Sequence, residues 1–192
     1  MTTTPAIAAR HLLIKQRFTL GVNRYEIRES DDMRTEGALI AMAQQKRFKL
    51  KEEVIFFADE ARTQRVFSFK ARNIMDLKSV ADIFDANQQV LGSFRKDFGA
   101  SFIRSTWFVQ QNGQAELRGE ERSLAVAILR RVMDIAWVPY HFDFVSADGR
   151  LGFSVVKGWG IRDKYLVSIY DASLDNRVVG AMAVALDSLQ NR

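Results

Sequence analysis

Histidine and cysteine are scarce in this chain of 192 residues, which limits the chemistry that it can perform. Because it has no cysteine, disulfide bonds, thiolate metal ligands and cysteine nucleophiles are excluded. The two histidines, His11 and His141, are 130 positions apart, whereas a catalytic triad needs a nucleophile, a base and a carboxylate in mutual reach. His141 and Asp143 are two positions apart, but alternate residues of a strand simply lie side by side on one face. We therefore predict no catalytic residues and a protein that is not an enzyme.

Acidic residues gather in two short segments that could bind a hard cation, Asp31-Asp32 and the stretch from Asp171 to Asp175. Loop carboxylates more often serve as turn residues, and neither segment has the glycine-containing pattern of a calcium loop. A zinc site would need more histidine or cysteine, and no glycine-rich phosphate loop is present. We predict no metal site and no cofactor.

Four basic residues form the first candidate binding site. Lys46, Arg47, Lys49 and Lys51 lie within six residues, next to Phe48. If this segment is a strand, Arg47, Lys49 and Lys51 share one face, which could hold the phosphate oxygens of an anionic lipid headgroup. Further basic side chains follow at Arg62, Arg65, Lys70 and Arg72. The alternative is an ordinary solvated strand face.

The excess of positive charge lies in the first half of the chain. The formal net charge is +5, and residues 1–96 hold 17 Lys and Arg against 12 Asp and Glu, while residues 97–192 hold 11 of each. A basic face attracts phosphate, either in lipid headgroups or in nucleic acid. Nucleic acid is the less favoured partner, because the aromatic residues alternate as core residues do and form no exposed stacking platform.

The second candidate surface is an amphipathic helix. Apolar periodicity predicts it over Gly119 to Trp137, within a helical insertion of about residues 117–138, with Pro139 ending it. Its partner-facing side chains would be Leu124, Ile128, Leu129, Val132 and Trp137. This apolar stripe could lie in a membrane interface, pack on the rest of the protein or meet a second subunit, so the oligomeric state stays open.

The elements that must position these residues are mostly strands. Alternating segments such as Tyr25 to Glu29, Val66 to Lys70 and Tyr165 to Tyr170 have one apolar and one polar face. Turn signals separate them, above all Asp148-Gly149. About twelve such strands, in a chain that is 47% hydrophobic and 27% charged, indicate a folded β-sandwich or barrel.

One more helix is predicted at the end of the sequence, over about residues 176–189. From Val178 to Leu186 it carries no charge, so it must be buried on every side, and it is too short to span a bilayer. A sheet that closes into a barrel around this helix satisfies both requirements and leaves no exposed sheet edge.

Basic residues beside aromatic ones recur along the chain in three segments: Lys15-Gln16-Arg17-Phe18, Gln45-Lys46-Arg47-Phe48 and Val156-Lys157-Gly158-Trp159-Gly160. In this order, followed by the apolar helix, they resemble the LURP-one-related family, grouped with tubby proteins and phospholipid scramblases in the tubby-like superfamily. The resemblance covers nearly the whole chain except residues 111–141, where the predicted helical insertion departs from the compact bacterial members. It implies a twelve-stranded barrel around a central C-terminal helix and, by analogy with tubby, a basic surface that binds anionic headgroups.

We therefore expect one mainly β domain over residues 1–192, a closed antiparallel tubby-like barrel around a buried hydrophobic helix, with one inserted amphipathic helix. The expected function is a binding or adaptor module that associates with anionic lipid headgroups. The alternatives are a module that binds nucleic acid or a protein partner and, least favoured, an enzyme with a pocket at the barrel mouth and a carboxyl of raised pKa. Because Met1 to Arg10 lacks a secretory signal pattern, we expect a cytoplasmic location, or peripheral attachment at the inner membrane face.

Overall fold

The period-two segments of the sequence form twelve strands in the part of the chain that the computed structural model describes, residues 9–19, 22–31, 35–46, 53–72, 80–97, 106–122, 140–157 and 164–190. The strands are β1 (Arg10–Thr19), β2 (Val22–Ser30), β3 (Leu39–Lys46), β4 (Glu53–Phe57), β5 (Arg65–Ala71), β6 (Val80–Asp85), β7 (Val90–Asp97), β8 (Thr106–Gln111), β9 (Leu117–Glu121), β10 (Tyr140–Val145), β11 (Leu151–Lys157) and β12 (Lys164–Ile169). One helix, α2 (Asn176–Gln190), follows them.

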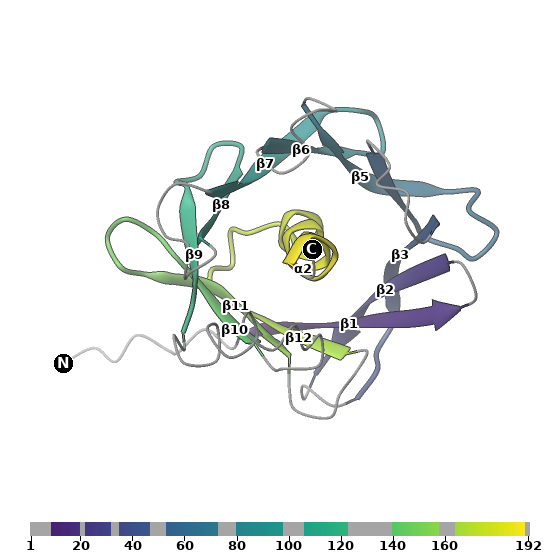
Figure 1. Cartoon of the computed structure of the whole chain (residues 1–192), viewed down its shortest axis with the longest axis horizontal. Coiled ribbons are helices and arrows are strands. Elements are labelled where there is room, and N and C mark those ends of the chain that lie inside the picture. The colour runs from purple at the N-terminus through teal and green to yellow at the C-terminus, as the bar shows by residue number, and fades with distance from the viewer. Residues whose placement is uncertain are drawn as a thin grey trace.

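The strands close into a barrel in which each pairs antiparallel with its neighbours in sequence (Figure 1). Closure comes from the pairing of the first strand with the last, which runs from Arg10↔Ile169 to Lys15↔Lys164. We call this β1–β12 pairing the closure joint. The predicted closed antiparallel barrel is confirmed, and the predicted hairpin at Asp148-Gly149 joins β10 to β11, with Gly149 at a φ of +83°.

Alternate side chains of each strand fill the inside of the barrel. On β10, Phe142 and Phe144 are fully buried, whereas His141 and Asp143 between them are only partly covered. Phe144 stacks on Phe153 of β11 with ring centroids 4.2 Å apart. This alternation is the physical basis of the period-two pattern, because one strand face meets the core and the other meets water.

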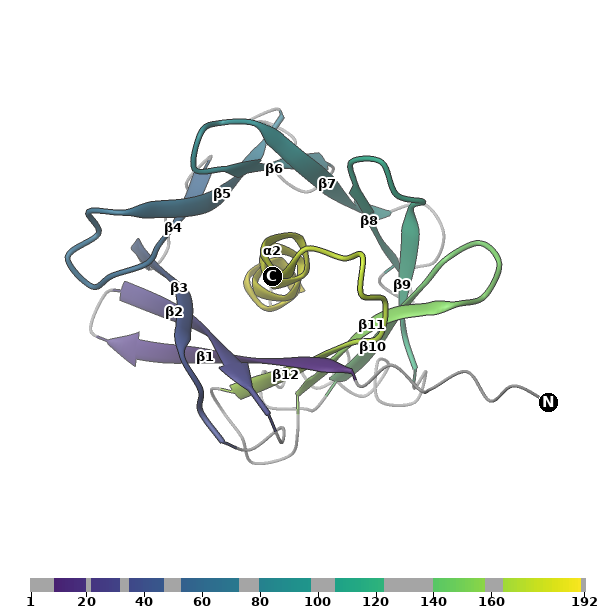
Figure 2. The same ribbon diagram turned by 180° about the vertical axis from the view of Figure 1, so that it is seen from behind.

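Helix α2 lies in the middle of the ring of strands from both directions of view (Figures 1 and 2). Its apolar residues from Val178 to Leu186 are each 1% exposed or less and belong to the same core cluster as the inward strand residues. Asp175 caps its start, since the Asp175 carboxylate accepts a hydrogen bond of 2.8 Å from the backbone N–H of Arg177. No helix among the described residues is long and apolar enough to span a bilayer.

A buried polar cluster holds the end of α2 against the barrel. The carboxylate of Asp187 accepts hydrogen bonds from the hydroxyls of Tyr25 on β2, at 3.0 Å, and Tyr165 on β12. Gln16 of β1 lies 3.1 Å from both hydroxyls, and the Lys157 ammonium lies 3.5 Å from the hydroxyl of Tyr165. Burial, together with the charge of Asp187, raises the pKa of Tyr165, so this hydroxyl stays protonated and donates a hydrogen bond to Asp187.

The predicted start of the amphipathic helix is wrong. Residues 119–121 belong to β9, in which Leu117, Gly119 and Glu121 are buried and Arg118 is exposed, the pattern of a strand. β9 hydrogen-bonds to β8 and β10, so a helix here would open the barrel. Gly119 also lets β9 approach closely, because a Cβ atom there would collide with the ring of Phe144. The remainder of the predicted helix, from residue 123 to Trp137, lies outside the described residues.

Candidate anion-binding face

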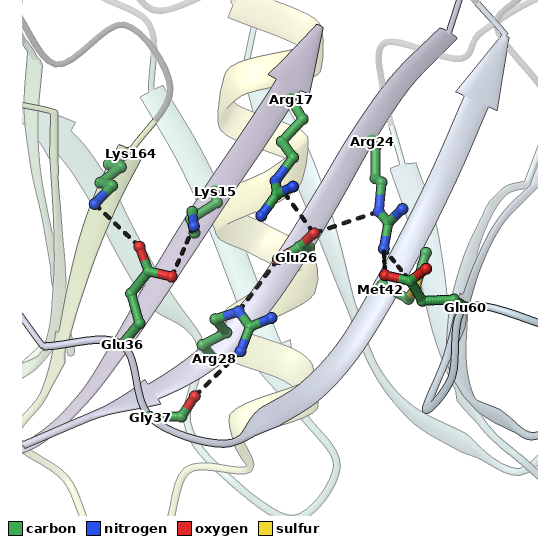
Figure 3. Close-up of polar contacts among 10 residues, drawn as sticks. All are labelled: Lys15, Arg17, Arg24, Glu26, Arg28, Glu36, Gly37, Met42, Glu60 and Lys164. Carbon is green, nitrogen blue, oxygen red and sulfur yellow. Dashed lines mark hydrogen bonds and ion pairs between the residues drawn. The ribbon is translucent and has the colours of Figure 1, made fainter. Parts of the chain in front are cut away.

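Cationic side chains lie along the outer faces of β1, β2 and β12, which are neighbours in the barrel (Figure 3). On β1, Leu12 and Ile14 belong to the core inside the barrel and Leu13, although buried, does not, so the odd-numbered positions face outward. On β2 the buried Tyr25 and Ile27 put the even-numbered positions outside. We call the resulting group the basic face, and it consists of Lys15, Arg17, Arg24, Arg28 and Lys164.

Three arginines of this face surround one buried carboxylate. The Glu26 side chain is only 3% exposed, and its oxygens lie 3.4 Å from Nε of Arg17, 3.4 Å from Nε of Arg24 and 3.2 Å from Nε of Arg28. Arg17 and Arg24 are directly opposite on β1 and β2, where two like charges would repel each other. Glu26 offsets that repulsion and holds all three guanidinium groups on one surface.

The two lysines of the face share a second carboxylate. Lys15 and Lys164 are directly opposite on β1 and β12, and Glu36, from the connection between β2 and β3, lies between them. Its Oε2 is 2.7 Å from Nζ of Lys15 and its Oε1 is 3.1 Å from Nζ of Lys164. Hydrogen bonds from these two ammonium groups lower the pKa of Glu36 to about 2.

A third carboxylate, Glu60 from the connection between β4 and β5, lies 2.6 Å from the guanidinium of Arg24. Figure 3 thus shows five cations facing three carboxylates, so the side chains drawn there have a net charge of +2. The Arg17 side chain is 55% exposed and that of Lys164 is 42% exposed, so part of this charge is open to solvent. The arrangement can bind an oxyanion through charge-assisted hydrogen bonds.

The residues that the sequence singled out for binding are not placed by the structure. Lys46 ends β3, and its backbone pairs with Val22 of β2, but its side chain lies outside the described residues. The other predicted headgroup ligands, Arg47, Lys49 and Lys51, also lie outside them. So do the predicted partner-facing residues Leu124, Ile128, Leu129, Val132 and Trp137. These assignments stay predictions.

The basic face itself was missed, although part of its signal is visible in the sequence. Lys15 and Arg17, like Arg24 and Arg28, occupy positions of equal parity in strands with an apolar alternate face. The sequence does not show that Lys164 lies beside these four residues, because this depends on the pairing of strands at opposite ends of the chain.

The other residues considered for chemistry make local contacts. His141 Nε2 lies 3.0 Å from Oδ1 of Asp143 on the outer face of β10, as predicted for strand neighbours. Asp171 accepts hydrogen bonds from the hydroxyl and the backbone N–H of Ser173, which lower its pKa. The described residues contain no group of three or more His, Asp or Glu arranged to hold a metal ion.

A small cavity of about 40 Å³ lies beside the segment that precedes α2. Its lining includes Leu117, Arg150, Asp171 and Leu174. Pockets that enclose an organic substrate usually measure about 300–1,000 Å³, so this one suits a few water molecules. The carboxyl group of Asp171 in its lining has a lowered pKa, so this cavity is not the site with a carboxyl of raised pKa that the enzyme hypothesis describes.

Comparison with known protein families matches residues 40–187 to the family described as LURP-one-related. This span begins in β3 and ends in α2, so it covers about three quarters of the chain. β1 and β2, which carry four cations of the basic face, precede it. No curated protein matches the chain. From the matched span and the closed barrel with its C-terminal helix, the chain belongs to the LURP-one-related family, a part of the tubby-like superfamily.

Proposed function

We propose that this LURP-one-related barrel is a non-enzymatic binding module that attaches reversibly to anionic membrane headgroups through its basic face. The observation that carries the proposal is the net positive charge over three adjacent strands, where Glu26 is buried beneath Arg17, Arg24 and Arg28. This inner counter-ion orders the arginines, and the side chain of Arg17, which is 55% exposed, keeps a solvent side that can meet an outer anion.

Electrostatics of this kind gives weak, salt-sensitive attachment. A basic residue near an anionic surface contributes about 1 kcal/mol, and the contribution falls off within a Debye length of about 8 Å at physiological salt. A face with a net charge of +2 therefore supports peripheral and reversible binding at the membrane.

Two predicted segments would extend the contact. β3 ends at Lys46, which pairs with Val22, two positions from Arg24 on β2. The basic residues Arg47, Lys49 and Lys51 follow directly in sequence and would add charge beside the basic face. The amphipathic segment with Leu129 and Val132 would add an apolar contact with the membrane interface or with a protein partner.

The test is co-sedimentation of the purified protein with phosphatidylcholine vesicles, with and without phosphatidylserine, at low and high salt. We expect binding to the anionic vesicles alone and its loss at high salt. Arg17→Gln should weaken binding about fivefold, the equivalent of about 1 kcal/mol. Arg118→Gln is the matched control, because its side chain is also 55% exposed but lies on β9, four strands away round the barrel.

Variants in the two predicted segments show which of them contributes to membrane binding. Changing Arg47, Lys49 and Lys51 to Glu should abolish binding if this segment extends the basic face. Binding that survives high salt but fails when Leu129 and Val132 are made polar would assign the contact to the amphipathic segment. An absence of binding to every vesicle would refute membrane attachment, and a steep salt dependence of binding to DNA or RNA would favour nucleic acid instead.

A further inference from the structure

Lys15 and Lys164 form an unfavourable pair that the chain neutralises with its own carboxylate. They are directly opposite on the closure joint and on the same outer face, where two like charges destabilise a sheet. Glu36 places one carboxylate oxygen on each ammonium, at 2.7 Å and 3.1 Å (Figure 3). The two lysines therefore have the spacing that holds one oxyanion by two of its oxygens.

The Glu36 carboxylate can move away from the two lysines without any change in the pairing of the strands. The backbone N–H of Gly37, the next residue, donates a 2.8 Å hydrogen bond to the carbonyl of Glu29, which fixes the main chain beside Glu36. The Glu36 side chain is 33% exposed, that of Lys164 is 42% exposed and that of Lys15 is 15% exposed, so solvent reaches the contact mainly from the side of Lys164. Rotation of the Glu36 side chain alone would uncover both ammonium groups.

We propose that the Lys15–Lys164 pair is a phosphate site, that Glu36 occupies it in the free protein, and that a phosphate group of the ligand replaces this carboxylate. The inference rests on the proposed function and names the group recognised on this part of the basic face. A phosphomonoester carries about −1.5 to −2 charges and three acceptor oxygens, so it can exceed a single carboxylate as a partner for two ammonium groups. Glu36 then sets the affinity, because any anion must compete with a tethered carboxylate at high effective concentration.

The experiment is a titration of the full-length protein with inorganic phosphate, followed by the NMR signals of the lysine side chains. Glu36→Gln should lower the dissociation constant about fivefold, the size expected for one charge next to a bound anion. Glu116→Gln is the matched control, since its carboxylate is 41% exposed and lies 3.1 Å from one cation, Arg95, but is not part of the basic face, and we expect a change of less than about twofold. Adding Lys15→Gln or Lys164→Gln to the Glu36→Gln variant should each reverse part of the gain, with thermal unfolding as the check on folding.

Equal effects of Glu36→Gln and Glu116→Gln would overturn the site, and so would a gain in affinity that survives the loss of both lysines. Vesicles of phosphatidylcholine with phosphatidic acid, a lipid phosphomonoester, distinguish this result from the proposed function. Tighter phosphate binding by Glu36→Gln without vesicle binding would leave the lysine site standing and refute membrane attachment. Vesicle binding that depends on Arg17, with no response of phosphate binding to Glu36→Gln, would refute the lysine site alone.

Discussion

Two glutamates at the basic face act differently on the cations around them. Glu26 is 3% exposed and is part of the sheet itself, so it holds Arg17, Arg24 and Arg28 from within the barrel wall. Glu36 comes from a connection, is a third exposed and holds the two lysines from outside. The carboxylate of Glu26 therefore orders the arginines. Under our proposal, the carboxylate of Glu36 competes with an incoming anion for the two lysines.

The contribution of Glu36 to stability should depend on pH. Its pKa is lowered from 4.5 to about 2 in the folded protein, so its ion pairs stabilise the fold fully above about pH 4.5, and this gain is lost as the pH falls from 4.5 to about 2. Solvent screening limits the gain to about 1 kcal/mol or less. Urea denaturation of the wild type and Glu36→Gln should show a stability difference at pH 6 to 7 that shrinks toward pH 3. A difference that stays constant over this range would contradict the assignment.

At the scale of elements, α2 is fixed to the barrel by contacts at its end as well as by its apolar sides. Asp187 lies near the C-terminus of the helix, where the helix dipole disfavours a negative charge. The hydroxyls of Tyr25 and Tyr165 stabilise that charge, and they come from strands on either side of β1. The position of the helix in the barrel is thereby specified by a polar contact that sliding or rotation would break.

Tyr165→Phe should test this attachment. The change keeps the ring and removes one hydrogen bond to the buried Asp187 carboxylate, so the free energy of unfolding should fall by about 1.5–3 kcal/mol. Tyr170→Phe is the control, because Tyr170 follows β12 directly but is 42% exposed. Urea denaturation of both variants measures the difference, and equal midpoints would mean that the hydroxyl of Tyr165 contributes nothing.

Some elements of the fold could be predicted from local sequence patterns, and others could not. The Asp148-Gly149 hairpin and the apolar α2 were predictable, because a tight turn and a charge-free run each have one physical solution. The start of the amphipathic helix was not, because Gly119 to Glu121 also fits the helical period, and only pairing with β8 and β10 makes it a strand. Long-range hydrogen bonds outweigh local periodicity there.

At the scale of the whole molecule, the barrel depends on one pairing between strands far apart in sequence. Every other neighbouring pair of strands in the barrel is consecutive along the chain. The closure joint instead brings together residues such as Lys15 and Lys164, and no local pattern in the sequence specifies that pair. For this reason the barrel could be predicted from its strands and apolar helix, whereas the basic face, which spans β12 and β1, could not.

The closure joint should form late in folding. Its loop-closure entropy is much larger than that of the β10–β11 hairpin, whose strands are joined by Ser146 to Arg150. Pulsed hydrogen exchange during refolding should protect the backbone amides of β10 and β11 before those amides of β1 and β12 that bond across the closure joint. Simultaneous protection of the two regions would contradict this order.

The position of the lysine pair on the closure joint has a consequence for how binding could be detected. An anion held between Lys15 and Lys164 is bonded to the first and the last strand at once. Separation of these strands would break both bonds, so the ligand binds the closed barrel and not the opened one. A bound ligand therefore stabilises the closed barrel against separation of its first and last strands. Saturating phosphate should raise the melting temperature and slow proteolysis at the junction of the two strands.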